Sequence, residues 1–386
     1  MSGQGTVRRR GDNRWEVRYQ VSPGKTATET VRGEKRDAEK RLRILLKLVD
    51  EGASKAPTRE TLNAWLSRWL AAKKATTAAS THQRYAEIAT KTIGPAIGDV
   101  PLGKLTPDRI AEFYTELATN GRKDGKPGGL SPRTQRHVHR LLKSALSAAA
   151  RRELIMRNPA DQLGGELPKI VKPNLATLNA AQARQLLDAV RHSQIYPAVL
   201  LALGAGLRRG EALAAGWGDL RGDVLTVRRS LEQTRAGIAF KTPKSGNTRS
   251  VVLPADTADE LRRWKARQAQ QLLHLGIRQT AETLICARMD SEPLQPQSLT
   301  HEFPRFLPRL GPDFPKVRFH DLRHSSATIA LAAGVDLKLV SERLGHTTIA
   351  ITADLYLHPD QTMHEAAAQK INDAFRLVAK SVAKPE

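Results

Sequence analysis

Hydrophobic and polar residues alternate along residues 5–32, the pattern that β-strands show when one face of a sheet is buried. The alternation is clearest where Trp15, Val17 and Tyr19 fall on one face. Asp-Asn and Pro-Gly pairs provide turns between the strands. Along residues 37–50 the apolar positions recur at helical spacing instead. The start of the sequence therefore predicts a three-stranded sheet with one helix.

Residues 58–157 have helical periodicity throughout. Thr58 or Thr61 can cap the first helix, and at Thr106 and Ser131 a capping hydroxyl is followed by proline at the first helical position. The helix that begins at Ser131 has an apolar side and a cationic side. The cationic side is formed by Arg133, Arg136, Arg140 and Lys143. A solvated charged face is the common explanation, but no acidic residue interrupts this stripe, which favours contact with phosphates.

Proline and glycine become frequent from Asn158 to Pro173, and this composition predicts a linker. After it, Asn179 and Gln182 match a capping box that opens another helix. Helical and strand patterns then alternate to the end of the chain. The predicted fold class is mainly α with small β-sheets (α+β).

An apolar helix in this last part breaks at Gly204 and Gly206, which places Arg208 at a backbone kink beside an apolar wall. Glu211 lies one helical turn after Arg208 and can orient its guanidinium. An arginine held in this way is suited to binding an anion.

Three strands are expected at residues 224–230, 237–242 and 249–253. Lys244 then falls in a turn that would join the last two strands as a hairpin. A lysine in a turn is more often a solubilising residue than a functional one, so a role for Lys244 depends on the other motifs of the chain.

Two imidazoles and a guanidinium share a predicted helix face further along the chain. His320, Arg323 and His324 stand at positions i, i+3 and i+4. A single histidine is more often structural than catalytic, but this combination is costly to bury without an anionic partner. A phosphate would satisfy all three side chains.

A further histidine and a tyrosine follow this cluster. Residues 335–344 have a helical pattern that Gly345 ends as a C-cap, so His346 stands just past a helix end. Tyr356 lies in a short segment between two leucines, where its hydroxyl is placed to act as a nucleophile. His358 follows without an assignable role.

Charge and composition narrow the class of partner. The formal net charge is +23, and lysine and arginine exceed aspartate and glutamate in every part of the chain, as expected of a protein that surrounds a polyanion. The single cysteine, Cys286, suits a reducing compartment. The longest apolar run, residues 195–207, contains Pro197 and is too short to cross a membrane, and no signal peptide is recognisable. We expect a cytoplasmic nucleic-acid-binding protein with no membrane partner.

Four motifs now stand in order along the chain, GLRRGE, TPKSGNTR, HDLRHSSAT and LGHTTIAITADLY. Together they resemble the motifs of tyrosine recombinases of the phage integrase family, although Ala205 replaces the threonine common before the first. By this resemblance, residues 1–56 are similar to an arm-site DNA-binding domain and residues 58–160 to a helical, SAM-like core-binding domain. A linker at 161–175 and a catalytic domain at 176–386 would complete the chain.

The resemblance implies a site-specific recombinase, such as a prophage or mobile-element integrase, that cuts and rejoins DNA through a 3′-phosphotyrosine without ATP, metal or another cofactor. Glu211 and His324 would support the catalytic residues, and a final helix at 361–383 would dock on a neighbouring subunit. The implied partners are double-stranded DNA at core and arm sites, a homotetramer on two duplexes, DNA-bending accessory proteins and an excision factor. The implied catalytic residues are Arg208, Lys244, His320, Arg323, His346 and the nucleophile Tyr356.

Three other functions stay open on the residues alone. A topoisomerase-like nicking-closing enzyme would share the covalent tyrosine chemistry but would relax DNA without exchanging strands. A non-catalytic DNA-binding regulator would explain the charge but not the ordered motifs. A metal-dependent hydrolase would use as ligands His320, Asp321, His324 and His346.

Overall fold

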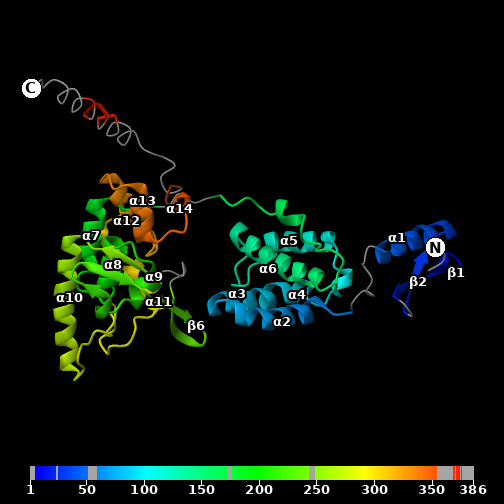
Figure 1. The fold of residues 1–386 in the computed structure, drawn as a ribbon, viewed down its shortest axis with the longest axis horizontal. Coiled ribbons are helices and arrows are strands. Elements are labelled where there is room, and N and C mark those ends of the chain that lie inside the picture. The colour runs from blue at the N-terminus through cyan, green and yellow to red at the C-terminus, as the bar shows by residue number, and fades with distance from the viewer. Residues whose placement is uncertain are drawn as a thin grey trace, which may run out of the picture. The chain divides into compact units, whose positions relative to one another are not determined.

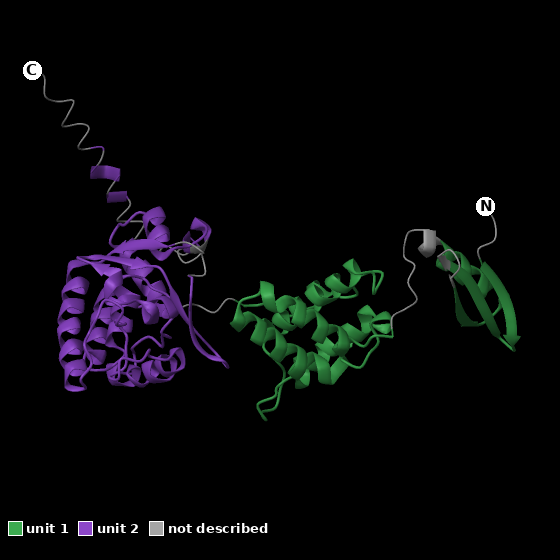
Figure 2. Ribbon diagram, turned by 60° about the horizontal axis from the view of Figure 1, so that its bottom comes forward, with its two compact units in different colours: residues 1–172 green, residues 173–386 purple. Residues whose placement is uncertain are grey.

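The structure is a computed structural model that describes residues 5–22, 25–50, 59–171, 176–242 and 248–353, and, near the C-terminus, residues 368–369, 371–373 and 375. The chain divides into two compact units, residues 1–172 and 173–386 (Figure 2). Helices predominate in both units, and the sheets are small and antiparallel (Figure 1). The predicted mainly α class with small sheets is confirmed. No helix among the described residues is both long enough and apolar enough to cross a membrane.

The first unit begins with the predicted three-stranded sheet. Its strands lie in the order β1–β2–β3, and the helix α1 packs on them through a small core around Val17, Ala38 and Leu45. Asn13 turns the chain between the first two strands with a φ of 53°. The bounds are β1 Gly5–Gly11, β2 Arg14–Ser22, β3 Lys25–Arg32 and α1 Lys35–Asp50.

A helical bundle follows, and the capping residues expected from the sequence begin its helices. The hydroxyls of Thr61, Thr106 and Ser131 accept hydrogen bonds from the backbone N–H three residues later. One π-helical turn, residues 89–93, extends α3. The helices are α2 Leu62–Lys73, α3 Ala79–Ile88, α4 Gly94–Ile97, α5 Pro107–Asn120 and α6 Pro132–Arg151.

The expected linker is shorter than the composition suggested. Ala160, Leu163 and Leu167 are buried in the same hydrophobic core as α6. The Asn158 side chain ties this segment down, because its amide donates to the carbonyl of Lys143 and to the hydroxyl of Ser147. The prolines and glycines indicate an irregular backbone in this segment, but the apolar residues between them are buried in the core of the helical bundle.

The second unit is built around α8, whose side chains are almost all buried and which packs against α7, α9, α10 and α12. Before α7, the backbone N–H of Leu178 donates to the hydroxyl of Ser325 on α12, 2.9 Å away. The capping box of Asn179 and Gln182 opens α7 as expected. The helices are α7 Ala180–Val190, α8 Tyr196–Gly204, α9 Arg209–Ala214, α10 Ala255–His274, α11 Pro296–Glu302, α12 Asp321–Ala332, α13 Leu337–Leu344 and α14 Ile349–Ala353.

The strands of this unit do not pair as the sequence suggested. The strand expected at 224–230 is interrupted at Arg228 and Arg229, so that two strands form. The side chains of these two arginines donate to Asp219 and to the carbonyl of Ala214. The second of these strands, β6, pairs with β7, whereas β8 pairs with β5. The predicted hairpin between residues 237–242 and 249–253 is therefore wrong. The bounds are β4 Leu220–Arg221, β5 Val224–Val227, β6 Ser230–Thr234, β7 Gly237–Lys241 and β8 Arg249–Val252.

Candidate active site

Arg208 lies where the sequence placed it, in the break between α8 and α9. Gly206 adopts a φ of +65°, which turns the chain between the two helices. Arg208 then occupies the N-cap position of α9 and donates from Nη1 to Oε1 of Glu211 over 2.7 Å, while its backbone N–H donates to Oε2. The expected contact between Glu211 and the Arg208 guanidinium is present. Glu211 is buried, so this contact fixes the arginine firmly.

Arg323 is a buried arginine on α12, only 3% exposed. Its Nη1 donates to the carbonyl of Gly206 and its Nη2 to the carbonyl of Leu344, each over 2.6 Å. Burial first, and then the nearby charges of Arg208 and Arg249, lower the pKa of Arg323 to about 9, although Glu211 opposes the shift. Arg323 is still protonated at neutral pH.

The C-terminal end of α13 brings the two arginines together. Gly345 ends this helix in the left-handed conformation, with a φ of 66°, as the sequence predicted. Its carbonyl accepts from Nη2 of Arg208 over 3.0 Å, and the preceding carbonyl, that of Leu344, accepts from Arg323. Residues distant in the sequence therefore meet at one helix end, where the unpaired carbonyls attract cations.

His346 follows Gly345 directly and lies within electrostatic reach of both arginines. Its Nδ1 contacts the hydroxyl of Thr352 at 2.7 Å. Burial lowers the pKa of His346 to about 4, with further lowering by Arg323, Arg208 and other nearby cations. The imidazole is therefore neutral at pH 7.

His320 and His324 lie together at the start of α12. Their ring centroids are 5.4 Å apart and the rings are nearly perpendicular. His320 is the N-cap residue rather than part of the helix body, so the predicted helical face begins one residue later. Partial burial, His324 and Arg323 lower the pKa of His320 to about 4, and burial also lowers that of His324.

The metal-ligand set considered for a hydrolase is not assembled. Both carboxylate oxygens of Asp321 accept hydrogen bonds from Arg318, through its backbone N–H, Nε and Nη2. Within the described ranges, no three or more histidine, cysteine, aspartate or glutamate side chains are grouped to hold a metal ion. The Asp321 carboxylate is thus engaged by Arg318.

Several predicted residues lie outside the described part of the chain. Lys244, Tyr356 and His358 are among them, as is most of the helix expected at 361–383. The catalytic roles of all six residues, Lys244 and Tyr356 included, stay predictions.

The four cations predicted to bind phosphates on α6 are of two kinds. Arg133 and Arg140 are exposed. Arg136 donates to the carbonyls of Leu167 and Pro168, and Lys143 pairs with Asp161 at 3.4 Å. The stripe has no acid of its own, but the segment after α6 supplies one. The sequence did not indicate this contact.

The sequence reasoning missed Arg249, which belongs to the same group of charges. Its guanidinium donates to both carboxylate oxygens of Glu211, over 3.2 Å and 2.7 Å. The only sequence signal was that Arg249 closes the motif TPKSGNTR, a few residues after Lys244.

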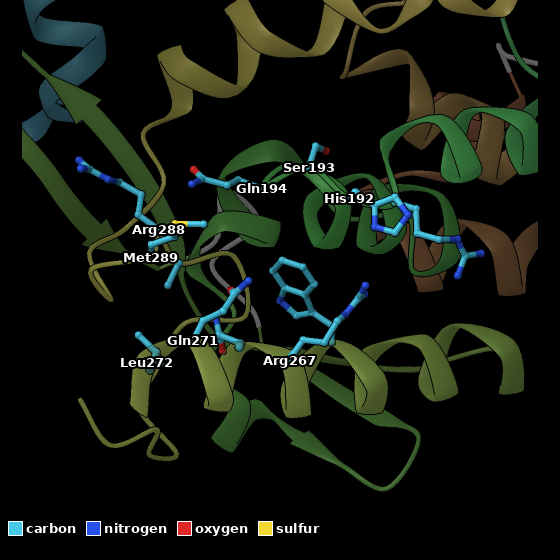
Figure 3. A pocket seen from close by; sticks show the side chains of 12 residues that line it. His192, Ser193, Gln194, Arg267, Gln271, Leu272, Arg288 and Met289 are labelled. Carbon is cyan, nitrogen blue, oxygen red and sulfur yellow. The ribbon is translucent and has the colours of Figure 1, made fainter. Parts of the chain in front are cut away.

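A separate pocket of about 180 Å³ lies in the same unit between α10, residues 191–194 and residues 287–289 (Figure 3). Its lining includes Arg191, Arg267 and Arg288 but none of the predicted catalytic residues. This pocket is not part of the candidate active site.

Comparisons with known proteins agree with the family that the motifs resemble. The phage integrase family matches residues 176–363, and the phage integrase N-terminal SAM-like domain matches residues 61–118. The chain is 26% identical over 286 residues to a "tyrosine recombinase XerC-like" protein of Caldanaerobacter subterraneus, covering 69% of this chain and 71% of that protein. It is 25% identical over 365 residues to an integrase of Streptomyces ambofaciens, covering 92% of this chain and 88% of that protein.

Solved structures share the fold. The integrase of transposon Tn1549, in complex with transposon right end DNA, superposes with a TM-score of 0.66 at 20% identity, over 81% of this chain and 99% of that chain. A lambda integrase dimer bound to a core site gives a TM-score of 0.60 at 18% identity, over 92% of this chain and 96% of that chain. With two family matches along the chain and the motif arginines and histidine gathered at one helix end, this protein belongs to the phage integrase family and is a tyrosine-type site-specific DNA recombinase.

Proposed function

We propose that this recombinase cuts and rejoins double-stranded DNA at the core site of a mobile element or prophage, with Tyr356 as the nucleophile. The observation that carries the proposal is the meeting of Arg208, Arg323 and His346 at the end of α13. Two fixed guanidiniums and an imidazole around one point suit a phosphodiester in reaction.

In the proposed reaction, the Tyr356 hydroxyl attacks the phosphorus of a DNA phosphodiester. A bond forms between the tyrosine oxygen and the 3′-phosphate, and the bond to the 5′-oxygen breaks. The 5′-oxygen leaves as a hydroxyl after gaining a proton. Because one phosphoester replaces another, the bond energy is kept and ATP is not needed for resealing. An unperturbed tyrosine has a pKa near 10, and the cations around the phosphate would favour its ionised form.

Arg208 and Arg323 would donate to the non-bridging oxygens of the phosphate as negative charge develops in the transition state. Loss of one such donor typically costs roughly 100-fold to 1000-fold in rate. Lys244 would give the proton to the leaving 5′-oxygen. His346, whose Nδ1 contacts Thr352, would use Nε2 toward the phosphate, and His320 would assist the proton transfer.

The remaining contacts with DNA would come from the first unit. The exposed Arg133 and Arg140 of α6, with Arg136 and Lys143 beside them, would contact the phosphates of the core site, and the N-terminal sheet would bind arm sites. Strand exchange would take place in a homotetramer on two duplexes, in the cytoplasm of a bacterial host. DNA-bending proteins and an excision factor would assist it.

The test is a single-turnover reaction of the full-length protein with a nicked DNA that carries the core site from the flanks of the encoding element. The nick lets the short 5′-hydroxyl fragment diffuse away, so the covalent complex accumulates. With chelator present, we expect the wild type to form an SDS-resistant protein-DNA adduct and Tyr356→Phe to form none. Tyr85→Phe removes a hydroxyl elsewhere and should behave as wild type.

Each result has a definite meaning. If footprinting shows the core site occupied but the wild type forms no adduct, the covalent mechanism is wrong. An adduct that appears only without chelator would return a metal-dependent mechanism to consideration. If the adduct forms but paired sites give only relaxed DNA and no exchanged strands, the enzyme is of the nicking-closing kind.

A further inference from the structure

Three successive carbonyls at the C-terminal end of α13 each accept a hydrogen bond from a different arginine. The carbonyl of Arg343 accepts from Nε of Arg249 over 3.1 Å. The next two, those of Leu344 and Gly345, accept from Arg323 and Arg208. The last carbonyls of a helix lack donors within the helix and carry the negative end of its dipole. This helix end therefore orients three guanidiniums side by side.

Arg249 is also linked to one of the other two arginines, Arg208, through Glu211. Arg249 donates hydrogen bonds to both carboxylate oxygens of Glu211, and Glu211 also accepts a hydrogen bond from Arg208. A closed ring of contacts results, from Arg249 through Glu211 and Arg208 to Gly345 and back along the chain to Arg343. The side chain of Glu211 is 1% exposed and that of Arg249 is 12% exposed, so water competes little for these bonds.

The charge balance shows what Arg249 contributes. Burial alone would raise the pKa of Glu211, but the hydrogen bond and charge of Arg249, followed by the side-chain and backbone hydrogen bonds of Arg208, lower it to about 2. Without Arg249, the buried carboxylate would keep a single cationic partner, and the carbonyl of Arg343 would lose its donor. Glu211 could then draw the Arg208 guanidinium away from the direction that Gly345 gives it.

Packing also fixes Arg249 against the helix end. A Cβ atom added at Gly345 would lie 2.9 Å from Cδ of Arg249 and 3.0 Å from its Nε. Arg249 thus lies flat on the backbone that bears the carbonyl of Gly345. Its guanidinium donates to the Glu211 carboxylate and to the carbonyl of Arg343.

We propose that Arg249 is a positioning residue of the recombinase, which sets the direction of the Arg208 guanidinium through Glu211 and the end of α13 without touching the DNA. The inference rests on the proposed function, because the phosphate is what Arg208 is positioned for. It differs from a purely structural role in one respect: the effect of Arg249 on the rate should depend on the presence of Arg208.

The experiment is a double-mutant cycle on the adduct assay with nicked core-site DNA. Arg249→Met keeps the length of the side chain but removes its charge and donors. We expect the rate of adduct formation to fall about 10-fold to 100-fold, by analogy with the loss of a residue that orients a metal ligand. In an Arg208→Lys background, adding Arg249→Met should lower the rate of adduct formation by less than about 3-fold, because the guanidinium through which Arg249 acts is already absent. The dissociation constant for core-site DNA should not change.

Arg221→Met is the matched control, since Arg221 is an exposed arginine of the same small sheet. It should leave the rate unchanged. Arg249→Lys keeps the positive charge beside Glu211 but loses the bidentate hydrogen bonds, so this variant should fold and show an intermediate rate of adduct formation. If Arg249→Met is unfolded, the cycle is run with Arg249→Lys.

Three outcomes would overturn the inference. The first is a wild-type rate of adduct formation for Arg249→Met, and the second is a double-mutant rate reduced by the product of the two single-mutant effects. The third is DNA binding weakened more than in Arg221→Met, which would mean that Arg249 contacts DNA directly. A wild-type protein that forms no adduct would instead refute the proposed function. The two failures are therefore distinguishable.

Discussion

At the scale of single residues, the site holds neutral histidines among fixed cations. The pKa values of His320 and His346 lie at about 4 in the free protein, because burial and neighbouring cations disfavour the imidazolium. A bound phosphate would act in the opposite direction, since a nearby anion favours the charged form. In the proposed reaction, the histidines would therefore take up a proton only when the reacting phosphate enters.

The same shifts predict how stability depends on pH. Unfolded histidines titrate near 6.5, so between about pH 6.5 and pH 4 the unfolded chain binds protons that the folded chain does not. The free energy of unfolding should be highest above pH 6.5 and fall as the pH is lowered through this window. Chemical denaturation at a series of pH values measures it.

Substitution should show how much of the slope comes from His346. His346→Gln should make the dependence shallower, whereas His192→Gln, at an exposed site, should leave it unchanged. A stability that is flat from pH 7 to pH 4.5 in the wild type would contradict the assigned protonation states.

At the scale of elements, local sequence signals fared better than contacts between elements. The caps at Thr61, Thr106 and Ser131 and the left-handed Gly345 were all predictable, because each depends on a few neighbouring residues. The pairing of β8 was not. It depends on Leu225 and Val251 being buried opposite one another, and a strand pattern gives the burial of a residue but not its partner.

The site shows the same division. Spacing along one helix indicated that Glu211 could meet Arg208, and it did. The contacts of Arg323 with Gly206 and Leu344 come from three separate elements, and their acceptors are main-chain carbonyls that every residue has. No sequence pattern marks such an acceptor. Arg249 escaped notice for the same reason, since its partner lies on another element.

The end of α13 gives a test at this scale. Gly345→Ala should destabilise the protein by about 1–2 kcal/mol from the left-handed backbone alone, and further because the new methyl group would press on Arg249. Gly276 is the matched control: it has a φ of +74°, but no atom within 4 Å of an added Cβ. Gly276→Ala should show the backbone cost only, in denaturant unfolding, and an unchanged rate of adduct formation.

Gly345→Ala should also slow adduct formation, because Arg208 and Arg249 both depend on this helix end. Equal destabilisation by the two substitutions, with an unchanged rate for Gly345→Ala, would show that the arginines tolerate movement of α13.

At the scale of the whole molecule, positive charge is spread over both compact units rather than held in one tail. A net charge of +23 implies strong and salt-sensitive association with a polyanion. Many of these cations are already used inside the protein, as Arg136 and Lys143 show. Net charge alone therefore overstates the number of residues available to phosphates, and the structure separates the two kinds on α6.

That separation predicts different salt dependences for neighbouring residues of one helix. The logarithm of the association constant for DNA falls as the logarithm of the salt concentration rises. Replacing Arg133 or Arg140 by alanine should make this slope less steep by about 0.9 each, measured by titration of core-site DNA between about 50 and about 200 mM salt. Arg136→Ala should change that slope less, because its guanidinium is held by the carbonyls of Leu167 and Pro168, and should instead lower the thermal stability. If the three variants lose the same slope and keep the same stability, the whole face of α6 binds DNA and the contacts of Arg136 give way when DNA is bound.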